Sequence, residues 1–135
     1  MSRAARISVA LCVLAGVLEP ALADASRPAR TAEKHAIVIA ANGGVDFPLR
    51  CVNIRVSTVA TGWAAVRAVP GTTSINAMWC SHNGYVFHGA SFLHKRGKVW
   101  RRVVAGTSVP KARCARVPVA VRADLAAYAR LLHCH

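Results

Sequence analysis

The sequence predicts an α+β domain with two layers, in which about four antiparallel strands pack against an N-terminal and a C-terminal helix. Three patterns support this fold class. Residues Arg50–Thr58 alternate apolar and polar side chains, as a strand with one buried face does. Residues His94–Lys98 form a polar turn between two segments of high β-propensity, which is typical of a hairpin. Near the end of the chain, four apolar residues recur at helical spacing: Val121, Leu125, Tyr128 and Leu132.

The first element expected in the domain is a helix that runs from Thr31, a candidate N-cap, to Asn42. Glu33 falls in its first turn, where the helix dipole favours an acidic side chain. The Gly43-Gly44 pair ends the helix. A strand over Ile37–Ile39 is the alternative for this segment. The apolar stripe of the helix would consist of Ile37, Ala40 and Ala41.

Four strands are expected to follow. The first is Arg50–Thr58, and Thr61-Gly62 turns the chain into a second strand over Trp63–Val69. A long loop over residues 72–84 separates these two strands from a third, Tyr85–Leu93. The hairpin turn then leads into the fourth strand, Val99–Ala105.

The end of the chain predicts an irregular segment and then the second helix. Residues Gly106–Val117 carry no periodic pattern, and Pro118 is well placed for the first turn of a helix. The apolar positions that follow would form one helical face against the sheet.

The first 23 residues have the three parts of a signal peptide. Arg3 and Arg6 are followed by an apolar run, Ile7–Leu18, and small residues precede a cleavage position after Ala23, with a second candidate after Ala25. The run of 12 residues is short for a membrane span, which needs about 20. We therefore expect a mature chain without a membrane span, located outside the cytoplasm: secreted, periplasmic or in the cell envelope. Residues 24–30 are expected to form a flexible tail, and residues 31–135 a single domain.

The composition is strongly basic. The chain has 18 Lys and Arg residues against 5 Asp and Glu, a formal charge of +13. Cleavage after Ala23 leaves 16 basic and 4 acidic residues, a charge of +12. Such an excess attracts polyanions, so the expected partners are an anionic envelope polymer or a protein, with non-specific binding of nucleic acid a further option.

Cysteine usage supports export. Cys12 would leave with the signal peptide, and an even number of four cysteines remains. In an exported chain of this size they predict two disulfides, and three pairings are possible. A zinc site is disfavoured because no two cysteines are closely spaced. The layout of the elements favours the pairs Cys51–Cys80 and Cys114–Cys134.

Three short runs are similar to those of known proteins. They are residues 54–58 followed by residues 62–66, residues 97–106 with the sequence Gly-Lys-Val-Trp-Arg-Arg-Val-Val-Ala-Gly, and residues 117–125. Together they resemble small exported proteins of GC-rich bacteria that have no assigned function. The resemblance covers about residues 50–134. It implies an α+β module with a strand-turn-strand centre and brings no catalytic residue.

Most catalytic chemistries are poorly supplied. The mature chain has too few acids for paired-carboxylate catalysis, and it lacks G-x-S-x-G, phosphate-loop and dinucleotide patterns. Histidines remain, and two imidazoles could serve as acid and base in a secreted nuclease. His88 and His94 would share one strand face but lie about 20 Å apart, too far for one phosphate. The alternative is that the histidines are ordinary surface residues; they are His35, His82, His88, His94, His133 and His135.

The densest basic cluster flanks the expected hairpin turn. Cations there could contact phosphate or sulfate groups, and an indole could stack on a base or a sugar. Alternatively the turn is merely solvated and its tryptophan faces the core. Arg101 and Arg102 alternate in direction, so at most one shares a face with Trp100. The candidate polyanion-binding residues are Lys95, Arg96, Lys98, Trp100, Arg101 and Arg102.

These observations favour a non-enzymatic module that binds an anionic polymer or a protein partner outside the cytoplasm. No cofactor or metal is expected; the terminal His133-Cys134-His135 could ligate copper or zinc, but the expected disulfide would occupy the thiolate. A small secreted hydrolase that depends on histidine is the first alternative. A secreted inhibitor or toxin is the second, since small disulfide-bonded domains often serve in that way.

Overall fold

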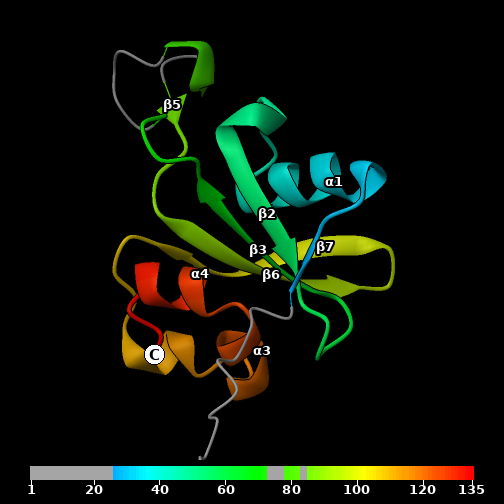
Figure 1. Cartoon of the computed structure of the whole chain (residues 1–135), viewed down its shortest axis with the longest axis vertical. Coiled ribbons are helices and arrows are strands. Elements are labelled where there is room, and N and C mark those ends of the chain that lie inside the picture. The colour runs from blue at the N-terminus through cyan, green and yellow to red at the C-terminus, as the bar shows by residue number, and fades with distance from the viewer. Residues whose placement is uncertain (1–25, 73–77, 83–84) are drawn as a thin grey trace, which may run out of the picture.

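The computed structural model of the chain describes residues 26–72, 78–82 and 85–135. Its centre is a five-stranded antiparallel sheet with the strand order β1-β2-β3-β6-β7, and a separate hairpin pairs β4 with β5 (Figure 1). The strands are β1 (Arg27–Pro28), β2 (Val52–Val56), β3 (Trp63–Ala68), β4 (Ser81–His82), β5 (Tyr85–Val86), β6 (Ala90–Arg96) and β7 (Val99–Gly106). The helices are α1 (Thr31–Ala41), α2 (Lys111–Cys114), α3 (Val119–Asp124) and α4 (Ala126–Leu131), with 3₁₀-helices η1 (Leu49–Cys51) and η2 (Met78–Cys80).

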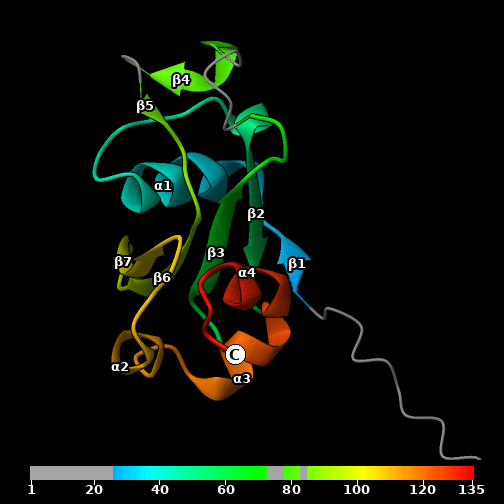
Figure 2. The same ribbon diagram turned by 90° about the vertical axis from the view of Figure 1, so that its left-hand side faces the viewer.

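The α+β class is confirmed, but the arrangement differs from the expected two layers and four strands. Helix α1 packs on one face of the sheet, and α3 and α4 pack on the other, as Figures 1 and 2 show. Each face has its own core: Ile37 and Leu93 belong to the first, and Phe92 and Leu125 to the second. The reason is visible in β3, where four consecutive residues, 63–66, are buried. A strand that is apolar on both faces needs cover on both sides.

The segment before α1 adds a strand to the sheet, although residues 24–30 were expected to form a flexible tail. Arg27 and Pro28 pair with Val56 and Arg55 of β2. The guanidinium of Arg55 donates hydrogen bonds to the hydroxyl oxygen of Ser26 (3.0 Å) and to its carbonyl. This pairing makes β1 the outer strand on one side of the sheet.

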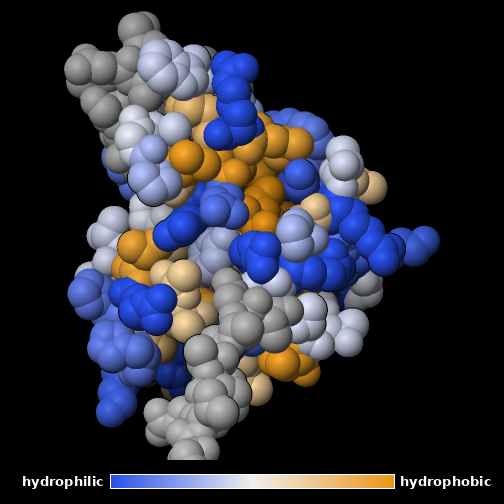
Figure 3. Space-filling model, viewed as in Figure 1, coloured by the Kyte–Doolittle hydropathy of each residue, from blue (hydrophilic) through white to orange (hydrophobic). Residues whose placement is uncertain are grey.

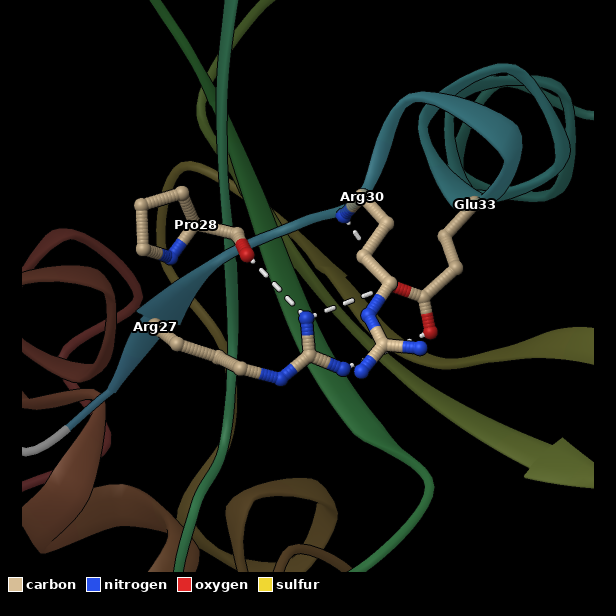
Figure 4. A network of polar contacts seen from close by, with 4 residues as sticks. All are labelled: Arg27, Pro28, Arg30 and Glu33. Carbon is tan, nitrogen blue, oxygen red and sulfur yellow. Dashed lines mark hydrogen bonds and ion pairs between the residues drawn. The ribbon is translucent and has the colours of Figure 1, made fainter.

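A polar network joins β1 to the start of α1 (Figure 4). Arg27 donates from both terminal nitrogens to the carboxylate of Glu33, at 3.3 and 3.4 Å, and also to the carbonyl of Pro28. The backbone N–H of Arg30 donates to the same carboxylate at 3.0 Å. Arg30 is therefore the N-cap, one residue before the expected Thr31. The helix ends before Gly43, as expected, and its buried residues are Ile37, Val38 and Ala41.

The strand expected over Tyr85–Leu93 is divided into two. Its first part, β5, pairs with β4, while the sheet strand β6 begins only at Ala90. Gly89 lies at the division with φ +70°. A side chain there would place its Cβ 1.9 Å from the carbonyl oxygen of Gly106, so the close approach of the two backbones requires glycine.

The last apolar stripe is buried as expected, but it lies on two short helices rather than one. Val121, Leu125 and Leu132 are fully buried, and Tyr128 is nearly so. The helix breaks at Leu125, whose φ and ψ of −109° and 39° are not helical. The carboxylate of the preceding Asp124 accepts hydrogen bonds from Ser57 Oγ (2.6 Å) and the N–H of Thr58 (2.9 Å), which ties the break to the β2–β3 loop.

Two disulfides pair the four cysteines of the described region as expected. Cys51–Cys80 joins η1 to η2, and Cys114–Cys134 joins α2 to the end of the chain, with Cα–Cα distances of 5.5 and 5.2 Å. Among the described residues, none of the helices combines the length and the apolar character that crossing a bilayer requires.

Candidate functional site: a basic sheet edge

The basic hairpin forms, and its tip extends to the side of α3 and α4, about as far as the start of α1 (Figure 1). Strand β6 reaches Arg96, and the turn consists of Gly97 and Lys98, so it is shorter than the expected His94–Lys98. The cations of this hairpin are all exposed, and strongly hydrophilic side chains cover this part of the visible surface (Figure 3). No ion pair links them to a carboxylate of the described residues. They are Lys95, Arg96, Lys98, Arg101 and Arg102.

The register separates these residues between the two faces of the sheet. Lys95 pairs with Trp100, and His94 pairs with Arg101, so Arg101 points away from the tryptophan. Trp100 is only 6% exposed and belongs to the core under α1. The structure therefore shows Trp100 as a core residue, which was the alternative to a tryptophan that stacks on a ligand. The Lys95 ammonium lies 5.7 Å from the centre of the indole ring, within cation–π range, and further limits its access to a ligand.

Arg102 shares the face of Trp100 and has a structural partner. Its Nη1 donates a hydrogen bond of 3.1 Å to the carbonyl of Ala41, the last residue of α1. A cation at this position also interacts favourably with the negative end of the helix dipole. Arg102 therefore joins α1 to the sheet and brings a fixed positive charge to the end of the helix.

Beyond Arg102 the hairpin leads into a cleft of about 500 Å³, which we call the β7 cleft. Five consecutive residues of β7, Arg102–Gly106, line it. Successive side chains of a strand point to opposite faces, so a cavity that touches five in a row faces the edge of the strand. Helices α1 and α2 lie on opposite sides of this edge (Figure 2). The side chains that complete the lining include Asn42, His88, Ser91, Arg113 and Arg116.

The β7 cleft carries positive charge that no carboxylate of the described residues neutralises. Three arginines line it, and none of the three acidic residues in the described part of the chain does. Glu33 pairs with Arg27, Asp46 with His35, and Asp124 with the β2–β3 loop. Arginine stays charged at any physiological pH, and its planar guanidinium matches carboxylate, sulfate and phosphate oxygens. The cleft is therefore suited to an anion.

Sequence reasoning missed Arg113 and Arg116, because residues 106–117 showed no periodic pattern. In the structure, Arg113 belongs to the single turn of α2 and Arg116 follows it, three residues later. The spacing of three is the signal that could have placed both on one side of a helical turn. The disulfide of Cys114 then holds this turn against the core below β7.

Of the histidine side chains that the structure describes, only His88 lines the β7 cleft. This residue precedes β6. It therefore does not lie on the strand of His94, although the sequence predicted that the two would share one strand face. The ring of His94 stacks on Trp63 with a centroid distance of 4.5 Å. His35 lies 3.1 Å from the carboxylate of Asp46, and both side chains are half exposed. The described residues contain no group of three that could hold a metal, and the side chain of His82 is outside the described region.

Comparisons of the chain with protein-family models, with curated proteins and with solved structures found no match. The resemblance to small exported proteins therefore stays a prediction.

Proposed function

We propose that the protein is a non-enzymatic module that acts outside the cytoplasm and binds a polyanion along its basic edge. We define the basic edge as the exposed hairpin and the β7 cleft that continues it. The observation that carries the proposal is the cleft itself, which three arginines line and no described carboxylate neutralises. The residues of the basic edge are Lys95, Arg96, Lys98, Arg101, Arg102, Arg113 and Arg116.

The two parts of the basic edge contribute differently. At the hairpin the cations are exposed, so salt screens their attraction strongly, and they recognise charge density rather than shape. In the cleft the walls exclude part of the solvent, which strengthens the interaction of an arginine with an anion. A polyanion that spans both parts would gain attraction from the hairpin and geometric fit from the cleft.

Two observations support the location. The two disulfides persist in oxidising compartments and are rare in the cytosol. The three-part pattern of residues 1–23 supports export. The histidine-dependent hydrolase has weaker support, because the described histidine–acid pair, His35 and Asp46, is half exposed and lies away from the β7 cleft.

Binding of a sulfated polysaccharide and of single-stranded DNA, each at low and at physiological salt, tests the proposal. We compare three variants with the parent: Arg113→Gln/Arg116→Gln in the cleft, Lys95→Gln/Arg96→Gln/Lys98→Gln at the hairpin, and the control Arg50→Gln/Arg130→Gln. The control removes two exposed arginines that line neither part of the basic edge.

We expect both edge variants to weaken binding more than the control does. For DNA, the slope of the logarithm of the binding constant against the logarithm of the salt concentration should flatten by roughly 0.7–0.9 for each phosphate that the variant no longer neutralises. If the control weakens binding as much as the cleft variant, the charge acts diffusely and the site is refuted. If only the hairpin variant retains parental affinity, the hairpin is a solvated turn and the site is confined to the cleft.

A further inference from the structure

The outer strand β7 offers an unpaired backbone edge. In the described part of the chain, β7 pairs only with β6, and none of its backbone groups takes part in a backbone hydrogen bond to another loop or helix. An edge strand of eight residues leaves a row of N–H and C=O groups free to pair with another strand. Five consecutive residues of β7 line the β7 cleft, so the cleft runs along this strand.

Positive side chains flank this edge on both sides. Arg102 points to the face that α1 covers, where it contacts Ala41. Arg113 of α2 and Arg116, which follows α2, also line the cleft, and α2 lies on the opposite side of β7 from α1 (Figure 2). A strand placed in the cleft would direct alternate side chains toward these two sides. Acidic side chains of either parity would therefore meet an arginine.

We propose that the β7 cleft binds an acidic, extended segment of a partner protein, which adds to the sheet as a sixth strand. This inference rests on the proposed function and names the class of polyanion. Nucleic acids and sulfated polysaccharides can satisfy the arginines, but they cannot supply the alternating donors and acceptors that an edge strand requires. A polypeptide supplies both.

The same charges exclude a second copy of this chain as the occupant. Two β7 edges in contact would bring the arginines of both copies together, and like charges on paired strands are unfavourable. The bulge in β7, where Val103 has no partner between the pairs Phe92–Val104 and Leu93–Arg102, interrupts regular pairing with any added strand at that point. The charges are therefore what protect the edge from self-association and leave it attractive to an acidic strand.

The test uses two peptides of equal charge and the disulfide-intact protein. One peptide alternates glutamate with threonine; the other has the same sequence with N-methyl groups on alternate backbone nitrogens, which removes hydrogen-bond donors on one side. Affinity is measured by fluorescence anisotropy, and hydrogen exchange is followed at the β7 amides. We expect the unmodified peptide to bind at least about tenfold more tightly than the methylated one. We also expect it to slow exchange within Val99–Gly106, and Arg113→Gln/Arg116→Gln to weaken its binding.

Three outcomes would overturn the inference. Equal affinity for the two peptides would mean that charge alone is recognised, and unchanged exchange in β7 would mean that the backbone edge is not used. In both cases the proposed function would stand. If neither peptide binds but the sulfated polysaccharide does, the partner is not a protein segment. If no polyanion binds, the proposed function itself fails.

Discussion

Gly89 is the residue at which the sheet requires glycine for two reasons. Its φ of +70° is unfavourable for other residues, and a Cβ would lie 1.9 Å from the carbonyl oxygen of Gly106. Gly43 has almost the same φ, +68°, but open space around its Cβ position. Comparing substitutions at Gly43 and Gly89 therefore separates the cost of backbone strain from the cost of a collision with the end of β7. That end of β7 forms one wall of the β7 cleft.

We expect Gly43→Ala to lower the free energy of unfolding by about 1 kcal/mol and Gly89→Ala by roughly 2–4 kcal/mol. Denaturant unfolding with the disulfides intact measures both. Equal losses would show that the backbones near Gly89 and Gly106 separate without cost, and that the close approach is not a fixed feature of the fold.

Glu33 links two elements, β1 and α1, and makes their junction sensitive to acid. Burial raises the pKa of Glu33, but the hydrogen bonds from Arg30 N–H and Arg27, with the charges of both arginines, outweigh it, and the pKa lies below its usual value. A lowered pKa in the folded state stabilises the fold above the ordinary glutamate pKa of about 4.3, and this contribution is lost as the pH falls through the folded value.

Between about pH 6 and pH 3, the parent should therefore lose more stability than Glu33→Gln, which has no carboxylate to protonate. Thermal unfolding across this range gives the comparison. Arg27→Gln should reduce the acid sensitivity in part, because the N–H of Arg30 still donates to the carboxylate. Identical pH profiles for the parent and Glu33→Gln would contradict this description of the junction.

The C-terminal helices form the core element on their side of the sheet. Leu125 is fully buried at the break between α3 and α4, whereas Leu131, of the same type and six residues later, is 41% exposed. Leu125→Ala should cost roughly 2–5 kcal/mol in unfolding free energy and Leu131→Ala less than about 1 kcal/mol. Comparable losses in denaturant unfolding would place Leu125 outside the core.

The sequence predicted elements that depend on periodicity and missed those that depend on tertiary contacts. The alternation of β2 and the spacing of Val121, Leu125 and Leu132 follow from which residues are apolar, so they could be predicted. The pairing of Arg27–Pro28 with β2 depends on polar contacts from Arg55 and Glu33 that no local pattern shows. The break at Leu125 likewise depends on the hydrogen bonds that Asp124 receives from the β2–β3 loop.

The basic composition of the chain becomes a localised site only through the fold. The hairpin cluster is contiguous in sequence, so its cations could be identified in advance. The β7 cleft could not, because Arg102 and Arg116 line one cleft only in the folded chain, where a disulfide joins α2 to the end of the chain. Because helices cover both faces of the sheet, β7 is left as an open edge strand that lies between α1 and α2.

Mapping where a polyanion binds distinguishes a localised basic edge from diffuse surface charge. Isotope-labelled protein is titrated with a short sulfated oligosaccharide, and the chemical shifts of the backbone amides are followed by NMR. We predict saturable shifts concentrated at the basic edge: Asn42, residues 95–106 and residues 113–116 should respond, while Arg50 and Arg130 should not. Shifts of similar size at all exposed arginines, or a response centred away from β7, would contradict the proposed binding edge.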